Sequence, residues 1–347
     1  MKASCKKHVL HFKRPSGTSR GILKTKDAYY LILEENGRKG YGECGLLRGL
    51  SIDDRPDYEE KLQWVCEHIS LGEKVLYDAL TQFPSIQIAV EAAFKSLRAQ
   101  DPFQLFDTPF SKGEKSIPIN GLIWMGDTNF MRSQIKEKLK DGFSCIKMKI
   151  GAIDFASEIA LLKNIRKEFT AQEIALRVDA NGAFSPKGSL EKLKQLAALD
   201  IHSIEQPIKQ GQWEEMARLC EQSPLAIALD EELIGVFTEE KKIKLLDTIK
   251  PQYVILKPSF IGGFRGADRW IALAAEKGID WWVTSALESN VGLNAIAQYT
   301  STKNSILPQG LGTGNLYTNN VPSPLDVDHG AILYNIAAQW GLDILNH

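Results

Sequence analysis

Five short apolar stretches of this chain each run into charged side chains, at nearly equal intervals. The polar residues that close these stretches are 30, 26, 25 and 27 positions apart, counted from 149 to 179, 205, 230 and 257. They are Lys149, Asp179, Glu205, Asp230 and Lys257. A charged group at the end of a buried strand costs free energy unless something binds there. The repeat therefore predicts a series of buried strands whose ends form a binding site.

The wider pattern predicts a closed barrel. We expect strands near 117–123, 145–150, 175–180, 202–206, 226–230, 253–257, 281–286 and 306–311. The segments between them have the period of helices, as in 155–169, 190–199, 239–249 and 267–276. Eight strands that alternate with helices are typical of a parallel α/β barrel. An open doubly wound sheet is the alternative, but no GxGxxG motif follows the first strand.

The first hundred residues have a different pattern, which predicts a separate α+β domain. Strands are expected at 7–13, 27–34 and 40–44, with a polar loop at 14–21 between the first two. Helices are expected near 55–70, 73–82 and 84–100. The regular order fades after residue 314. We therefore expect a capping domain at 1–112, a barrel at 113–315, and a C-terminal segment at 316–347 that returns to the cap.

Composition narrows the class of protein. The 347 residues are 44% hydrophobic and carry a net charge of −1, which gives no electrostatic reason to bind nucleic acid or an anionic membrane. No run of about 18 apolar residues could span a bilayer, and no apolar segment follows the charged N-terminus as in a secretory signal. The five cysteines are scattered without a CxxC motif. We expect a cytoplasmic enzyme with reduced thiols and a small-molecule substrate; the sequence does not give the oligomeric state.

The five polar strand ends fit one kind of chemistry. In barrels of this type the site lies at the C-terminal ends of the strands. Asp179, Glu205 and Asp230 would repel one another there unless a cation held them, and oxygen ligands suit Mg²⁺, with Mn²⁺ as the alternative. Lys149 and Lys257 would face each other across the ring, one on each side of a substrate. A metal and an amine together suit the removal of a proton next to a carboxylate.

Each feature alone has an ordinary structural explanation. Acidic residues at strand ends are often helix N-caps, and Glu231 and Glu232 fit the first turn of a helix. A Schiff-base aldolase would use a late lysine but would need no cluster of three carboxylates. A binding protein without activity would need neither lysine. The agreement of five strand ends in order favours a metal-dependent enzyme.

The motifs at these positions resemble the enolase superfamily, in its muconate-lactonizing subgroup, over essentially the whole chain. They are KMK at 147–149, DAN at 179–181, EQP at 205–207, DE at 230–231 and LKPS at 256–259. The resemblance implies a modified (β/α) barrel with an α+β cap. It also implies a metal held by Asp179, Glu205 and Asp230, with Lys149 as general base and Lys257 as the opposing lysine.

Within the subgroup, residues 284–292 and 309–314 are most similar to the dehydratases of menaquinone biosynthesis. Dipeptide epimerases usually have an Asp-x-Asp at the eighth strand, where this chain has Gly310-Leu311-Gly312; its own Asp-x-Asp at 326–328 is expected to be a surface turn. The resemblance implies dehydration of a cyclohexadiene carboxylate by proton abstraction and enediolate stabilisation. Racemase, epimerase and cycloisomerase activities remain alternatives.

The glycines would leave room for the substrate, and their backbone N–H groups could meet a carboxylate. The residues expected to bind substrate are Lys147, Arg177, Asn181, Ser285, Ser289, Gly310 and Gly312.

Overall fold

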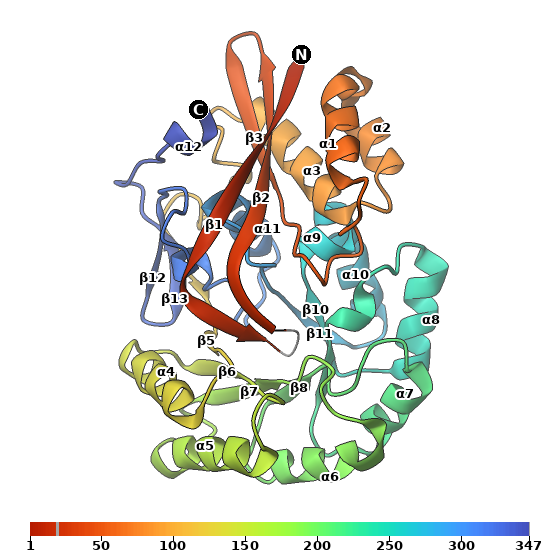
Figure 1. Ribbon diagram of the computed structural model, residues 1–347, viewed down its shortest axis with the longest axis vertical. Coiled ribbons are helices and arrows are strands. Elements are labelled where there is room, and N and C mark those ends of the chain that lie inside the picture. The colour runs from red at the N-terminus through yellow and green to blue at the C-terminus, as the bar shows by residue number, and fades with distance from the viewer. Residues whose placement is uncertain (19–20, 347) are drawn as a thin grey trace.

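A curled parallel sheet with helices on its outer side forms one part of the molecule, and an antiparallel sheet with three helices covers its mouth (Figure 1). The structure is a computed structural model that describes residues 1–18 and 21–346. The arrangement confirms the expected fold class, an α/β barrel with an N-terminal α+β cap.

The cap sheet is a meander of three antiparallel strands, β1 (Lys2–Thr18), β2 (Gly21–Glu35) and β3 (Arg38–Cys44). Its alternating side chains divide between two cores. Tyr29, Leu31 and Leu33 face the cap helices, whereas Ala28 and Tyr30 pack with residues of the barrel and the C-terminal segment. The loop expected at 14–21 is wrong for residues 14–18, which continue β1 beyond a register shift between His11 and Ser16. Positions 19–20 of that loop lie outside the described residues.

The cap helices are α1 (Tyr58–Glu67), α2 (Gly72–Ala79) and α3 (Pro84–Arg98), with a single 3₁₀ turn, η1 (Ile69–Leu71), between the first two. α3 begins with a proline, whose missing N–H costs nothing at a helix start. Nearly all of its residues are buried, because it packs on the cap sheet on one side and on the barrel on the other. α3 is therefore the central element of the contact between the cap and the barrel.

Seven parallel strands form the barrel sheet, and sequence neighbours pair throughout. They are β5 (Gly121–Ile123), β6 (Cys145–Lys149), β7 (Ala175–Asp179), β8 (Ser203–Glu205), β9 (Ile227–Leu229), β10 (Tyr253–Leu256) and β11 (Asp280–Val283). The eighth strand expected at 306–311 is reduced to isolated bridges. Gln309 pairs with Ile119, and Gly310 pairs with Thr284, so these two residues close the gap between the sheet edges.

Helices follow the strands on the outer side of the sheet (Figure 1). They are α4 (Thr128–Lys140), α5 (Phe155–Glu168), α6 (Pro186–Ala197), α7 (Trp213–Gln222), α8 (Glu239–Ile249), α9 (Pro258–Ile261), α10 (Gly263–Glu276) and α11 (Asn290–Ser301). Asp127, Asp154, Thr238 and Ser289 accept hydrogen bonds from backbone N–H groups in the first turns of α4, α5, α8 and α11. Two 3₁₀ turns, η2 (Glu231–Leu233) and η3 (Gly314–Leu316), follow Asp230 and Thr313.

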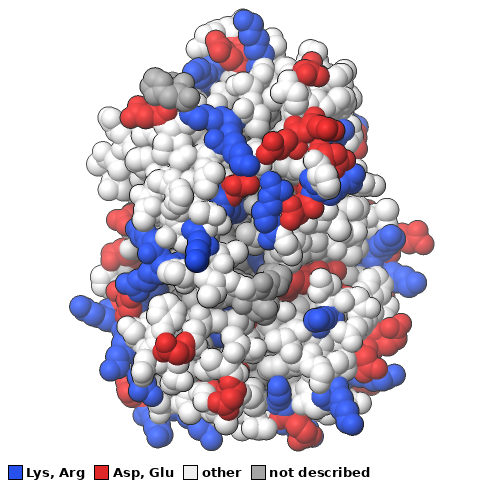
Figure 2. All heavy atoms as spheres, in the orientation of Figure 1, with Lys and Arg blue, Asp and Glu red and all other residues white. Residues whose placement is uncertain are grey.

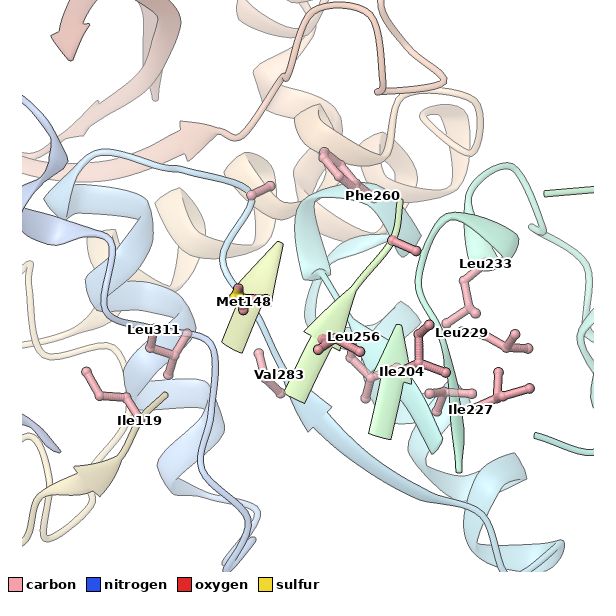
Figure 3. Packing of buried hydrophobic residues seen from close by; sticks show 14 of the residues in the cluster. Ile119, Met148, Ile204, Ile227, Leu229, Leu233, Leu256, Phe260, Val283 and Leu311 are labelled. Carbon is pink, nitrogen blue, oxygen red and sulfur yellow. The ribbon is translucent and has the colours of Figure 1, made fainter. Parts of the chain in front are cut away.

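The main core lies between the sheet and the outer helices. Met148, Ile204 and Leu256 are fully buried in it (Figure 3). Each of them is the sequence neighbour of a charged residue, Lys149, Glu205 or Lys257. Successive strand residues point to opposite faces, so the apolar residues pack under the helices while their charged neighbours point to the barrel axis.

The C-terminal residues cross back over the barrel to the cap. β12 (Leu325–Asp328) and β13 (Ala331–Tyr334) form a hairpin that pairs with β4 (Ile117–Pro118), so the first expected barrel strand, 117–123, is divided between two sheets. The surface turn expected at 326–328 is wrong, since these residues belong to β12. Tyr317 and Leu345, the latter on α12 (Asp343–Asn346), pack in one cluster with Leu10 and Tyr30 of the cap.

No helix in residues 1–18 and 21–346 is long and apolar enough to cross a membrane. Lys and Arg side chains are interspersed with Asp and Glu side chains over the face shown in Figure 2.

Candidate active site

The parallel register brings the charged strand ends to one edge of the sheet. Lys149 pairs with Asp179, and Asp179 pairs with Glu205, on neighbouring strands. Asp230 and Lys257 directly follow β9 and β10. All five residues therefore lie at the same end of the barrel, which faces the cap.

A cavity of about 770 Å³ lies between these strand ends and the cap. The barrel contributes lysines, an asparagine and a wall after β11, and the cap contributes residues from the β1–β2 hairpin and from the loop after β3. The site residues expected from the sequence that line it are Lys147, Lys149, Asn181, Lys257, Ser285, Gly310 and Gly312. Asp179, Glu205 and Asp230 lie beneath the lysines, with exposed fractions of 0, 2 and 2%.

Each carboxylate is paired with a lysine. Lys149 Nζ donates to Asp179 Oδ2 at 2.8 Å and to Asn181 Oδ1 at 2.7 Å. Lys147 Nζ lies 3.0 Å from Asp179 Oδ2 and also donates to Glu205 Oε2. On the opposite side, Lys257 Nζ donates to Asp230 Oδ2. The site therefore contains three buried carboxylates and three buried amines.

These charges shift one another's pKa values. Burial opposes ionisation of Asp179, yet the Lys147 and Lys149 ammonium groups hold the pKa of its carboxyl well below the usual range. Burial alone would lower the pKa of Lys257, but attraction to Asp230 and Glu205 raises it overall, so this residue is a stable cation. Burial raises the pKa of Glu205, and repulsion from Asp179 and Asp230 adds to the effect. Glu205 is the carboxylate with the least compensated charge.

The carboxylates fit a divalent cation in chemistry, although their present side-chain positions do not enclose one. In the described part of the chain, no three His, Cys, Asp or Glu side chains stand close enough together to hold a metal. The reason is that lysines occupy the carboxylate oxygens. Glu205 Oε1, however, is buried and has no hydrogen-bond partner among the described residues. An unpartnered carboxylate oxygen beside two further carboxylates is the donor set that Mg²⁺ prefers.

Two expected substrate-binding residues are placed elsewhere by the structure. Ser289 is fully buried at the start of α11, where its hydroxyl donates to Glu43 Oε2 at 2.5 Å and accepts from Val291 N. Arg177 lies deeper in the barrel, with its guanidinium 3.9 Å from the ring centre of Trp282, and it donates to Pro308 O. Neither residue is among those that line the cavity.

The role expected for the glycines after the eighth strand is also partly corrected. Gly310 lines the cavity, but its N–H donates to Val283 O at 2.8 Å and is not available to a substrate carboxylate. The Gly310 N–H thus closes the barrel. A side chain at this position would strike Thr284, which explains why glycine is needed there.

Several cavity residues were not expected from the sequence. Trp124 directly follows β5, so the rule that strand ends reach the site would have found it. Thr313 shares a 2.7 Å hydrogen bond with Ser285 at the far wall. Leu47 and Arg48 come from the cap loop after β3, and no local sequence signal places that loop over the barrel.

Comparison with known proteins identifies the class. Residues 131–343 match the family described as enolase C-terminal domain-like. The chain belongs to the enolase superfamily, as its motifs indicated.

Individual relatives narrow the comparison. The chain is 47% identical to the o-succinylbenzoate synthase of Desulfotalea psychrophila over 363 aligned positions, which cover 96% of this chain and 98% of that one. The crystal structure of MenC from the same organism matches with a TM-score of 0.85 at 43% identity, over 96% of this chain and 99% of that one. The L-Ala-D/L-Glu epimerase of Bacillus subtilis is 25% identical, over 83% of this chain and 80% of that one. The muconate lactonizing enzyme of Pseudomonas fluorescens, at 20% identity, shares the fold with a TM-score of 0.82 over 99% of this chain and 97% of that one.

Proposed function

We propose that this protein is a carbon–oxygen lyase, an o-succinylbenzoate synthase. It would dehydrate 2-succinyl-6-hydroxy-2,4-cyclohexadiene-1-carboxylate to 2-succinylbenzoate, a step of menaquinone biosynthesis. The observation that carries the proposal is the pair of lysines, Lys149 and Lys257, on opposite sides of a cavity with three carboxylates beneath it. The 47% identical synthase supports this reaction among those of the superfamily.

The chain's own groups account for the proton transfers. Lys149, held in place by Asp179 and Asn181, would accept the proton from the carbon that bears the ring carboxylate. The same amine would then return that proton to the departing hydroxyl, so that one C–H and one C–O bond break and water leaves. The ring becomes aromatic, which favours the products.

Lys257 would act through its charge. Its pairing with Asp230 raises its pKa, so it remains an ammonium near neutral pH and can stabilise the negative charge that develops on the substrate. Asp179, Glu205 and Asp230 would hold a divalent cation, Mg²⁺ or Mn²⁺, that neutralises charge on the substrate carboxylate when bound. Lys147, between Asp179 and Glu205, would balance the charge of the same carboxylates.

Racemisation of N-succinyl amino acids is a second candidate activity, because both lysines line the cavity and could serve as two bases. Gly310 and Gly312 stand where dipeptide epimerases carry acidic residues, which argues against dipeptides as substrates. The test is to assay turnover of the cyclohexadiene carboxylate beside panels of N-succinyl amino acids and dipeptides. We expect dehydration to have the highest kcat/KM; faster turnover of any panel member would overturn the proposal.

A further inference from the structure

A strained turn forms one wall of the cavity. Ser285, Ala286 and Leu287 line the cavity directly after the end of β11. Leu287 has a φ of 63°, in the left-handed region that a branched, bulky side chain rarely enters. Such strain persists only where surrounding contacts impose it. The contacts that hold this turn therefore determine the shape of the substrate site.

Glu288 is the main contact of the turn. Its Oε2 accepts a hydrogen bond of 2.6 Å from Ala286 N, and its Oε1 accepts one of 2.5 Å from Ser259 Oγ. Leu287 O accepts from the Tyr317 hydroxyl at 2.7 Å. The carboxylate thus connects the turn to the segment after Lys257, since Ser259 lies two residues beyond that lysine.

A buried lysine of the cap faces this carboxylate. Lys26 lies on β2, two residues before Ala28 and on the same face of the sheet. It is 4% exposed, and its Nζ is buried without a hydrogen-bond partner in the part of the chain that the structure describes. Burial raises the pKa of Glu288, and the charge of Lys26 is the largest effect in the opposite direction. A buried cation and a buried anion in the same interface stabilise each other only as a pair.

Other charged groups face the same cluster. Glu43 of β3 raises the pKa of Glu288, but its own carboxylate is occupied by Ser289 N, Ser289 Oγ and Gly292 N. Gly45, just after β3, sits so close that a side chain there would collide with Ser259 Oγ and Glu288 Oε1. The cap backbone therefore rests directly on the Ser259–Glu288 contact.

We propose that Lys26 is a positioning residue, which acts through Glu288 to hold the 285–288 turn in its strained form and so sets the affinity of the cavity for substrate. The proposal rests on the proposed function only for the choice of substrate. Lys26 does not line the cavity and touches no reacting atom. It makes the substrate wall depend on the seated cap, because the charge that fixes a barrel turn comes from a cap strand.

The test compares Lys26→Met with Lys242→Met. Lys242 is also a buried lysine, 6% exposed, but it lies on α8 against Trp270 and outside the cavity lining. We expect Lys26→Met to raise KM for the cyclohexadiene carboxylate and Kd for 2-succinylbenzoate about tenfold, with kcat and Mg²⁺ affinity nearly unchanged. Lys242→Met should lower thermal stability without changing KM. A wild-type KM in Lys26→Met would overturn the proposal.

Glu288→Gln provides a second route if Lys26→Met does not fold. It should raise KM in the same way, and the double variant should be no worse than the poorer single variant, because both changes remove one interaction. Fully additive losses would contradict action through Glu288.

A crystal structure of either variant gives a readout that needs no substrate. We expect Leu287 to leave the left-handed region, and an unchanged turn would count against the proposal. If the wild type does not dehydrate the cyclohexadiene carboxylate, the proposed function fails, while the conformation of Leu287 still decides the role of Lys26.

Discussion

At the scale of single residues, Asp53 is a buried acid with a structural role in the cap. It is fully buried, and its Oδ2 accepts hydrogen bonds from Ser85 N and Oγ at the start of α3. Burial raises the pKa of its carboxyl to about 6, despite those hydrogen bonds. The folded pKa exceeds the unfolded value of about 3.9, so the stability that Asp53 contributes is present below that value and is lost as the pH rises through 6.

We therefore expect Asp53→Asn, which cannot ionise, to gain stability relative to wild type as the pH rises. The measurement is the difference in Tm between variant and wild type from about pH 5 to pH 7.5. Asp54→Asn is the matched control with the opposite sign. Burial raises the pKa of Asp54, but its hydrogen bond from Arg48 outweighs this and lowers the pKa overall. Its variant should lose stability relative to wild type over the same range. A Tm difference for Asp53→Asn that does not change with pH would contradict the raised pKa.

Which residues reach the cavity was partly predictable from alternation along the strands. Lys147 and Lys149 were placed correctly because Met148 between them had to face the helices. Arg177 shares the strand face of Asp179, but it lies two residues earlier and so one layer deeper. The hydroxyl of Ser289 is occupied by Glu43, which is 246 positions away in the sequence. No local pattern reveals a partner at that distance.

At the scale of elements, long periodic segments were the most predictable. The structure begins and ends α5 and α8 within one residue of the expected 155–169 and 239–249. The eighth strand was overestimated because an apolar run can close a barrel through two bridges, without a full ladder. The β1–β2 hairpin was underestimated because Pro15 and Gly17 favour a loop. They are tolerated where the strand is irregular, at the register shift before Ser16.

The end of this hairpin contacts the barrel on the side of α4. Arg14 forms an exposed ion pair with Glu137 at 3.4 Å, and Gly17 bridges to Met125. Arg14, Ser16 and Gly21 also line the cavity. Replacing residues 14–21 by a tight turn should therefore raise KM and leave Mg²⁺ affinity nearly unchanged, because the carboxylates lie in the barrel.

Steady-state kinetics and a metal titration would test this expectation. Glu137→Gln is the matched control, which removes only an exposed ion pair and should change KM little. An unchanged KM in the shortened protein would show that the hairpin does not cover the substrate.

At the scale of the whole molecule, cap and barrel are joined by carboxylates at helix starts. Glu43 of the cap accepts from Ser289 N and Gly292 N at the start of α11, and Glu91 accepts from Phe264 N and Arg265 N at the start of α10. The helix dipole favours negative charge at these positions. The sequence shows the acids and the helices but not their pairing, which depends on how the two parts pack.

Metal binding should also be visible in the whole molecule. EDTA should abolish activity and Mg²⁺ should restore it, and Mg²⁺ at about 100 times its Kd should stabilise the fold by about 2.7 kcal/mol. Glu205→Gln should lose this stabilisation while it keeps the fold, since it removes one of three mutually repelling carboxylates. Glu232→Gln, a change at a buried neighbour outside the proposed ligand set, is the control and should retain the Mg²⁺ response. Full activity of the chelated protein would rule out the metal.

The central claim is that one lysine transfers the protons and the other supplies charge. Arginine keeps a positive charge but does not act as a base near neutral pH. Lys149→Arg should therefore lose dehydration by at least the roughly 10²–10⁴-fold typical of acid–base catalysis. Lys257→Arg should retain measurable dehydration, because the charge is kept.

The measurement is the dehydration rate of both arginine variants, after their folding and metal content have been shown to match wild type. N-succinylamino-acid racemisation is assayed in parallel, and a two-base racemase would lose it in both variants. The account predicts an inactive Lys149→Arg beside a Lys257→Arg that still dehydrates. Wild-type dehydration by Lys149→Arg would contradict it.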